Sequence, residues 1–154
     1  MVRIFENRRS WRVQFLLWMF ALVTAGFALM ALHGFVTGHE GNMIVGAILA
    51  PIGLIAALGM EFYARRYVTL IDYADGKARV ATRSLTGLHV NEGAADIGPL
   101  RKLLGISIAG EAVVSAVETQ HFMLKLTPPG KSFIVDVTAD PQIRERIAQA
   151  LGAS

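Results

Sequence analysis

Two apolar stretches decide the fold of this chain: residues 13–35, VQFLLWMFALVTAGFALMALHGF, and residues 43–63, MIVGAILAPIGLIAALGMEFY. Each stretch exceeds the roughly 20 residues that cross a bilayer as a helix, and the two contain almost no charge. A short loop separates them, as in a hairpin of two helices. We therefore predict an integral membrane protein anchored by a transmembrane hairpin over residues 13–63.

The composition agrees with a membrane anchor joined to a small soluble domain. Hydrophobic residues make up 53% of the chain and the mean hydropathy is +0.46, and the excess lies almost wholly in the first 63 positions. Residues 64–154 form a stretch of about 90 residues, enough for one modest core. The chain contains no cysteine, so disulfides, thiolate metal sites and cysteine nucleophiles are excluded. One soluble domain over residues 64–154 is expected.

The distribution of Lys and Arg predicts the orientation. Cytoplasmic flanks of spanning helices carry an excess of basic residues. Basic residues flank the outer ends of both stretches: Arg3, Arg8, Arg9 and Arg12 in residues 1–12, then Arg65 and Arg66. The loop at residues 33–42 has no Lys or Arg. Both termini are therefore expected in the cytoplasm, in a multi-pass protein of the bacterial inner membrane. A cleaved signal peptide is disfavoured because the first stretch is too long and a second follows at once.

Aromatic and basic residues mark the predicted membrane–water interface, where their mixed character fits the headgroup layer. The predicted interface residues are Arg8, Arg9, Trp11, Arg12, Trp18, Tyr63, Arg65 and Arg66. Small residues mark the predicted helix-packing faces, because they let two backbones approach closely. These residues are Gly46, Ala50, Gly53 and Ala57 in the second helix, and Ala21, Ala25 and Ala28 in the first. The two faces can pack against each other, which we favour, or against a foreign helix.

Polar groups are too few in the apolar stretches for a transport pathway. Glu61 lies at the cytoplasmic end, four residues before Arg65, and an i,i+4 ion pair accounts for it. His33, His39 and Glu40 cluster at the loop, but a structural zinc site needs four well-spaced ligands, so we predict no metal site and no cofactor.

The residues after the second stretch alternate as strands do. Asp75-Gly76 predicts a two-residue hairpin turn that places Ile71 opposite Val80 and Asp72 opposite Arg79. The predicted strands are 67–73, 78–85, 88–90, 103–109, 112–117, 121–126 and 132–137, with a loop over 91–99 and a turn at 128–130.

Asp140 predicts the start of a C-terminal helix that begins at Pro141 and ends near Gly152, with an apolar stripe of Ile143, Ile147 and Leu151. The predicted fold is thus a membrane α+β protein: a two-helix transmembrane hairpin followed by a small antiparallel β-rich cytoplasmic domain with a C-terminal helix. This order of elements resembles a small pleckstrin-homology-like module.

The inventory of reactive groups argues against an enzyme. His89 and His121 are the histidines of the soluble domain, each in a strand-like segment without a partner motif. The net charge of +3 and pI near 9.6 reflect basic residues at membrane borders, which disfavours nucleic acid as a partner. Arg101 and Lys102 are instead candidates for binding anionic lipid headgroups.

A family resemblance rests on short motifs behind the hairpin. These are Arg66-Tyr67-Val68-Thr69, then Val80, Thr82 and Gly87, then Asp96-Ile97. Together with the two spans, this layout resembles the transmembrane protein 70-like and 223-like families of two-span mitochondrial proteins. The resemblance implies a non-enzymatic role in assembling or stabilising respiratory or ATP synthase complexes.

Our main hypothesis is a membrane-anchored accessory or assembly subunit whose partner is a larger integral membrane complex. The alternative is a lipid- or peptide-binding sensor module at the membrane surface.

Overall fold

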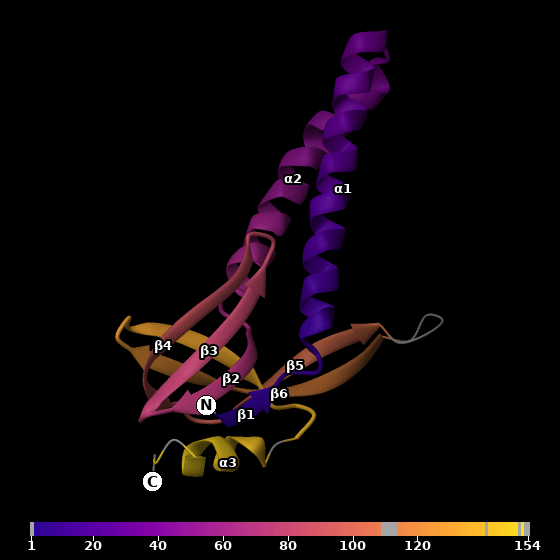
Figure 1. Cartoon of the computed structure of the whole chain (residues 1–154). Coiled ribbons are helices and arrows are strands. Elements are labelled where there is room, and N and C mark those ends of the chain that lie inside the picture. The colour runs from indigo at the N-terminus through magenta and orange to yellow at the C-terminus, as the bar shows by residue number, and fades with distance from the viewer. Residues whose placement is uncertain (1, 109–113, 141, 151, 153–154) are drawn as a thin grey trace. The chain divides into compact units, whose positions relative to one another are not determined.

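The computed structural model describes residues 2–108, 114–140, 142–150 and 152 (Figure 1). The chain divides into two compact units. The first, here the helical unit, contains Arg9–Arg65 and Arg83–Gly87, and the second, here the β unit, contains the rest. The short segment Arg83–Gly87 is the turn between two strands of the β unit, yet it belongs with the helices.

The helical unit is built from α1 (Ser10–Thr37) and α2 (Glu40–Ala64), which pack along each other. Gly38 ends α1 in the left-handed conformation, with φ of 73°, which glycine adopts without steric cost. The chain reverses there and enters α2 two residues later. The two long apolar helices predicted from the sequence are confirmed.

The β unit holds an antiparallel sheet of seven strands. The strands are β1 (Val2–Glu6), β2 (Val68–Ala74), β3 (Lys77–Ser84), β4 (Gly87–Ile97), β5 (Arg101–Ile108), β6 (Val114–Thr127) and β7 (Lys131–Asp136). Their order is β1-β2-β3-β4-β6-β5, and β7 also pairs with β6. The sheet curls, because a parallel bridge joins Ile134 of β7 to Tyr67, just before β2. The helix α3 (Ile143–Ala150) follows the sheet, so the α+β prediction is confirmed.

The predicted hairpin register between β2 and β3 is confirmed. Ile71 lies opposite Val80 and Asp72 opposite Arg79, and the turn is closed by Asp75 and Gly76. Both turn residues have positive φ, 53° and 76°, as a two-residue turn of this hand requires.

The core of the β unit lies inside the curled sheet. Its largest fully buried side chains include Phe122, Phe133 and Ile71. The helix α3 contributes Ile147, which is fully buried, and Ile143 packs beside it. Asp140 accepts a hydrogen bond from the backbone N–H of Gln142, 3.2 Å from Oδ1, at the start of this helix. The predicted helix residues Pro141 and Leu151 lie outside the described residues.

Three strand predictions need correction. Residues 2–6, predicted to be part of a basic tail, form β1, and Phe5 of this strand is buried in the core. Residues 91–97, predicted as loop, belong to β4. Gly93 does not break this strand, because the glycine there allows the backbone of Pro128 to approach closely. The described parts of the separate strands predicted at 112–117 and 121–126 form one strand, β6, because pairing with β5 continues through the polar residues between them. Residues 109, 112 and 113 of the predicted strands lie outside the described residues.

Candidate membrane-anchoring site

Glycines of both helices lie where α1 and α2 approach most closely. Gly34 of α1 is buried, and a Cβ atom added there would meet the backbone N of Met43 of α2. A Cβ atom added at Gly46 would lie 2.5 Å from the backbone N of Ala31 and 2.7 Å from the carbonyl O of Phe27. One added at Gly53 would lie 2.7 Å from Oγ1 of Thr24. The helices therefore approach so closely that a side chain at Gly46 would meet backbone. Of the other two residues predicted on this face, Ala57 is buried and Ala50 is half-buried.

The face of α1 that meets α2 differs from the predicted one. Ala21 is half-buried, but Ala25 and Ala28 are exposed. Gly46 and Gly53 approach α1 at Thr24, Phe27 and Ala31 instead. The reason is that Gly46 and Gly53 of α2 and Gly34 of α1 provide the close approach, so α1 needs no small residue at Thr24 and Phe27. Two exposed alanines consequently remain on the outer surface of α1.

The outer surface of the helix pair is apolar and exposed. An 18-residue window of each helix has a mean hydropathy of 2.3, and 6% of that window is buried. Phe35, Ile55 and Leu22 illustrate this, with 73%, 72% and 67% of their surfaces exposed. By length and composition both helices are suited to cross a membrane. Apolar surface of this extent favours burial against lipid or another protein.

Aromatic and basic side chains surround the ends of the helices that carry the chain termini. Trp11, Trp18 and Tyr63 are exposed. The guanidinium of Arg12 lies 5.7 Å from the ring centroid of Trp11, a cation–π distance. Among the remaining arginines predicted at the interface, Arg8, Arg65 and Arg66 are exposed and Arg9 is half-buried. Indole, phenol and guanidinium groups at one end of an apolar pair are the groups that suit a headgroup layer.

Glu61 organises the same end of the helical unit. Its Oε1 lies 2.8 Å from Nε of Arg65, so the predicted i,i+4 ion pair is confirmed. Its Oε2 accepts a hydrogen bond of 2.9 Å from the backbone N–H of Leu85 in the β3–β4 turn. The side chain of Glu61 is only 14% exposed. A carboxylate that binds both an arginine and a backbone amide is well satisfied at this degree of burial.

A second polar side chain holds the same turn from α1. Nε2 of Gln14 donates a hydrogen bond of 2.5 Å to the carbonyl O of Arg83. Within the turn, the hydroxyls of Ser84 and Thr86 lie 2.9 Å apart. Sequence reasoning missed this arrangement. The available signal was that Gln14 and Glu61 are the polar residues near the ends of the two apolar stretches, where each needs a partner.

The predicted lipid-binding pair lies on β5. Arg101 and Lys102 are both exposed, and they pair in the sheet with His121 and Gln120 of β6. His121 and His89 are half-buried. The exposed Leu100 precedes the pair, so a cationic and an apolar group are adjacent at this point of the β unit.

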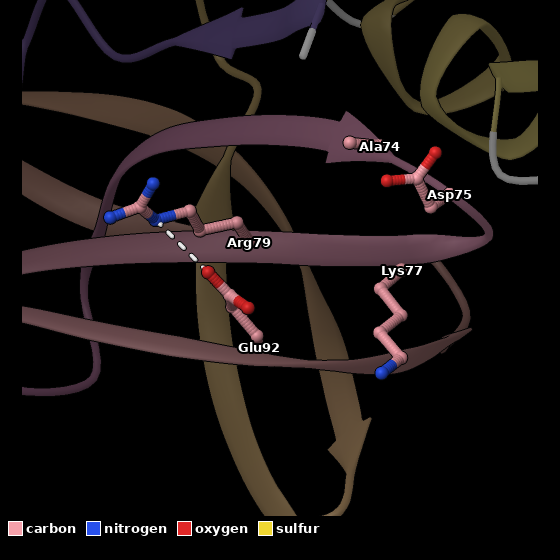
Figure 2. A pocket seen from close by; sticks show the side chains of 5 residues that line it. All are labelled: Ala74, Asp75, Lys77, Arg79 and Glu92. Carbon is pink, nitrogen blue, oxygen red and sulfur yellow. Dashed lines mark ion pairs between the residues drawn. The ribbon is translucent and has the colours of Figure 1, made fainter.

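A shallow hollow of about 320 Å³ lies at the β2–β3 turn, lined by Ala74, Asp75, Lys77, Arg79 and Glu92 (Figure 2). Nε of Arg79 lies 3.3 Å from Oε1 of Glu92, and Figure 2 shows this pair between β3 and β4. Two basic and two acidic side chains balance each other here. The hollow is therefore a solvated, charge-paired sheet surface rather than a site for a charged ligand.

The loop histidines lie side by side at the other end of the helices. The rings of His33 and His39 are stacked, with their centroids 6.5 Å apart, and Glu40 is exposed. Over the described part of the chain, no group of three or more His, Cys, Asp or Glu side chains is arranged to hold a metal ion.

Comparison with known proteins gives no relative for this chain. No protein-family model matches it, and neither a curated protein nor a solved structure does.

Proposed function

We propose that this chain is a non-enzymatic, membrane-anchored accessory or assembly subunit that stabilises a larger energy-transducing complex of the bacterial inner membrane. The observation that carries the proposal is the exposed apolar surface of α1 and α2, of which only 6% is buried in the most apolar windows. Bilayer lipid and neighbouring membrane subunits are the environments that would cover such a surface.

The orientation that we propose follows the basic residues. The exposed arginines Arg8, Arg65 and Arg66 lie at the ends of the helices that carry the termini, whereas the loop between the helices has none. Positive residues favour the cytoplasmic side, so both termini and the β unit would be cytoplasmic.

Two further features support an accessory role. The two-span hairpin and the short motifs that follow it in the sequence resemble those of the transmembrane protein 70-like and 223-like families. This resemblance implies a role in assembling respiratory or ATP synthase complexes. The curled antiparallel sheet followed by α3 has the order of elements expected for a pleckstrin-homology-like module. This is an analogy of fold, and by itself it does not assign a function.

The direct test is purification of the tagged full chain from its native membrane in mild detergent, followed by size analysis and mass spectrometry. We expect one large membrane complex to co-migrate at constant stoichiometry. Recovery of the chain alone, or only as its own oligomer, would contradict a stable accessory role and favour a transient assembly factor or the alternative below.

The alternative is a lipid- or peptide-binding sensor, favoured by Arg101 and Lys102 beside Leu100. It predicts that Arg101→Glu combined with Lys102→Glu abolishes photo-crosslinking of the chain to a phosphatidylglycerol analogue. Lys131→Glu is the matched control, because it removes an exposed positive charge elsewhere on the sheet. Equal crosslinking in both variants would exclude Arg101 and Lys102 as a lipid site.

A further inference from the structure

The β3–β4 turn lies beside the ends of the apolar helices. Leu85 binds Glu61 through its backbone N–H, and the carbonyl O of Arg83 binds Gln14. Gln14 is the second residue of the apolar stretch 13–35, and Glu61 is among the last residues of the stretch 43–63. Because both partners belong to the apolar stretches, the turn lies beside the ends of these stretches.

Exposed apolar side chains follow this turn directly. Leu88 is 66% exposed and Val90 is 40% exposed. Leu88 is the next residue after Gly87, so their Cα atoms are only about 3.8 Å apart. Side chains two residues apart on a strand share a face, so Leu88 and Val90 point the same way. Farther along this face of β4 the exposed residues are Glu92, Ala94 and Asp96. Along β4, this face is therefore apolar over the first residues after Gly87 and carries carboxylates farther along the strand.

We propose that the turn Arg83–Gly87, together with Leu88 and Val90, is a third membrane contact of this chain. The two apolar side chains enter the boundary between headgroups and acyl chains, and the exposed Arg83 binds headgroups of net negative charge. This inference rests on the membrane anchoring proposed above and adds to it a lipid-binding element in the β unit.

The bilayer is the occupant that the surroundings favour. Glu61, which binds the turn, lies one helical turn before Arg65. Tyr63 lies between Glu61 and Arg65 in the sequence. Arginine and tyrosine side chains at this place suit the headgroup layer, so the new surface continues the interface already formed by the helix ends. Arg83 complements anionic lipid headgroups. The two aliphatic side chains beside it match acyl chains better than an acidic protein surface would.

Single-cysteine labelling tests the proposal cleanly because the chain has no cysteine. Three full-length variants, Leu88→Cys, Ala94→Cys and Ala25→Cys, each receive an environment-sensitive fluorophore and are reconstituted into vesicles of phosphatidylethanolamine with phosphatidylglycerol as the anionic lipid. All three positions are exposed, so labelling should not disturb packing. Position 94 is the control on the same face of β4, and position 25 reports whether α1 is in the bilayer.

We expect a blue-shifted emission at position 88 that is quenched most by lipids brominated near the headgroup. Position 25 should be quenched most by bromine deep in the acyl chains, and position 94 should emit as in water. Adding Arg83→Glu to Leu88→Cys should reduce the blue shift in these vesicles and leave it unchanged in uncharged phosphatidylcholine vesicles.

The outcomes separate the two proposals. A lipid signal at position 25 with a water-like signal at position 88 would overturn the third contact and leave the anchor intact. A water-like signal at position 25 would overturn the anchor and the contact together. An effect of Arg83→Glu that is equal in both vesicles would remove the assigned binding of Arg83 to headgroups of net negative charge.

Discussion

The carboxylate of Glu61 accepts a hydrogen bond from the backbone N–H of Leu85 at 2.9 Å, which joins residues 24 positions apart. One side chain near the end of α2 thereby fixes the backbone of a strand-to-strand turn. The same carboxylate binds Arg65, so the negative charge of Glu61 is compensated near the end of the apolar part of α2. Removing the carboxylate should therefore affect the turn and not only the helix.

Glu61→Ala should loosen the β3–β4 turn. A hydrogen bond to a charged group contributes about 1.5–3 kcal/mol, and loss of about 1.4 kcal/mol corresponds to a tenfold change in an equilibrium. We expect the Leu85 amide to exchange its hydrogen roughly tenfold faster or more, as measured by hydrogen–deuterium exchange of the full chain in micelles.

Two controls accompany this measurement. Glu61→Gln keeps an acceptor for Leu85 and should give a smaller increase in exchange. Glu40→Ala removes an exposed carboxylate at the start of α2 and should leave the turn unchanged. Unchanged exchange at Leu85 in Glu61→Ala would show that this hydrogen bond does not hold the turn.

Gly46→Ala should destabilise the helix pair. The new Cβ would lie 2.5 Å from the backbone N of Ala31, so one backbone must move. Overpacking of this kind costs about 1–3 kcal/mol. We expect a lower thermal unfolding temperature in micelles and a wider distance between α1 and α2, measured between spin labels at Ala28→Cys and Ile52→Cys.

Gly59→Ala is the matched control for Gly46→Ala. Both changes add one methyl group to a glycine of α2, but nothing lies within 4 Å of a Cβ at Gly59. Alanine is also favoured over glycine in a helix by about 1 kcal/mol. The unfolding temperature should stay the same or rise. Equal destabilisation by the two variants would mean that glycine is not required for close packing at Gly46.

Ile147→Ala should weaken the attachment of α3 to the sheet. Ile147 is fully buried among the core residues of the β unit. Replacing a buried isoleucine by alanine costs about 2–5 kcal/mol, which lowers the unfolding temperature of a chain of this size by roughly 5–15 °C. Circular dichroism on heating would measure it. Gln149→Ala, an exposed change in the same helix, should shift the transition little, and a similar shift in both would contradict the assigned packing.

Local signals in the sequence predicted much of this fold. Apolar length predicted both helices, and Asp75-Gly76 predicted the β2–β3 register, because each depends on residues close together in the chain. The strand β1 was missed because its partner β2 follows more than 60 residues later, and five residues before a basic segment carry too little pattern. Pairing with β2 and burial of Phe5 in the core supply what local propensity lacks.

The candidate site was predictable only in part for the same reason. The spacing of Glu61 and Arg65 indicated an ion pair, but the hydrogen bond from Leu85 depends on the path of the chain through β2 and β3. Small-residue spacing identified the contact face of α2 and misplaced that of α1 at Ala25 and Ala28. The spacing of alanines in α1 did not indicate that Gly34, near the C-terminal end of that helix, provides its close contact with α2.

Gly76→Ala should destabilise the β2–β3 hairpin, because Gly76 has φ of 76° in the turn. A residue with a Cβ pays roughly 1–2 kcal/mol in this left-handed region. We expect faster hydrogen exchange of the cross-strand amides at Asp72 and Arg79, by a factor of about 5–30.

Asp75→Gly provides the opposite control within the same turn. Asp75 already has φ of 53°, so glycine removes local strain there while increasing the freedom of the unfolded chain. These two effects oppose each other, and hairpin stability should change by less than about 1 kcal/mol. Marked destabilisation by Asp75→Gly, with no effect of Gly76→Ala, would mean that the Asp75 side chain, and not positive φ at Gly76, specifies the turn.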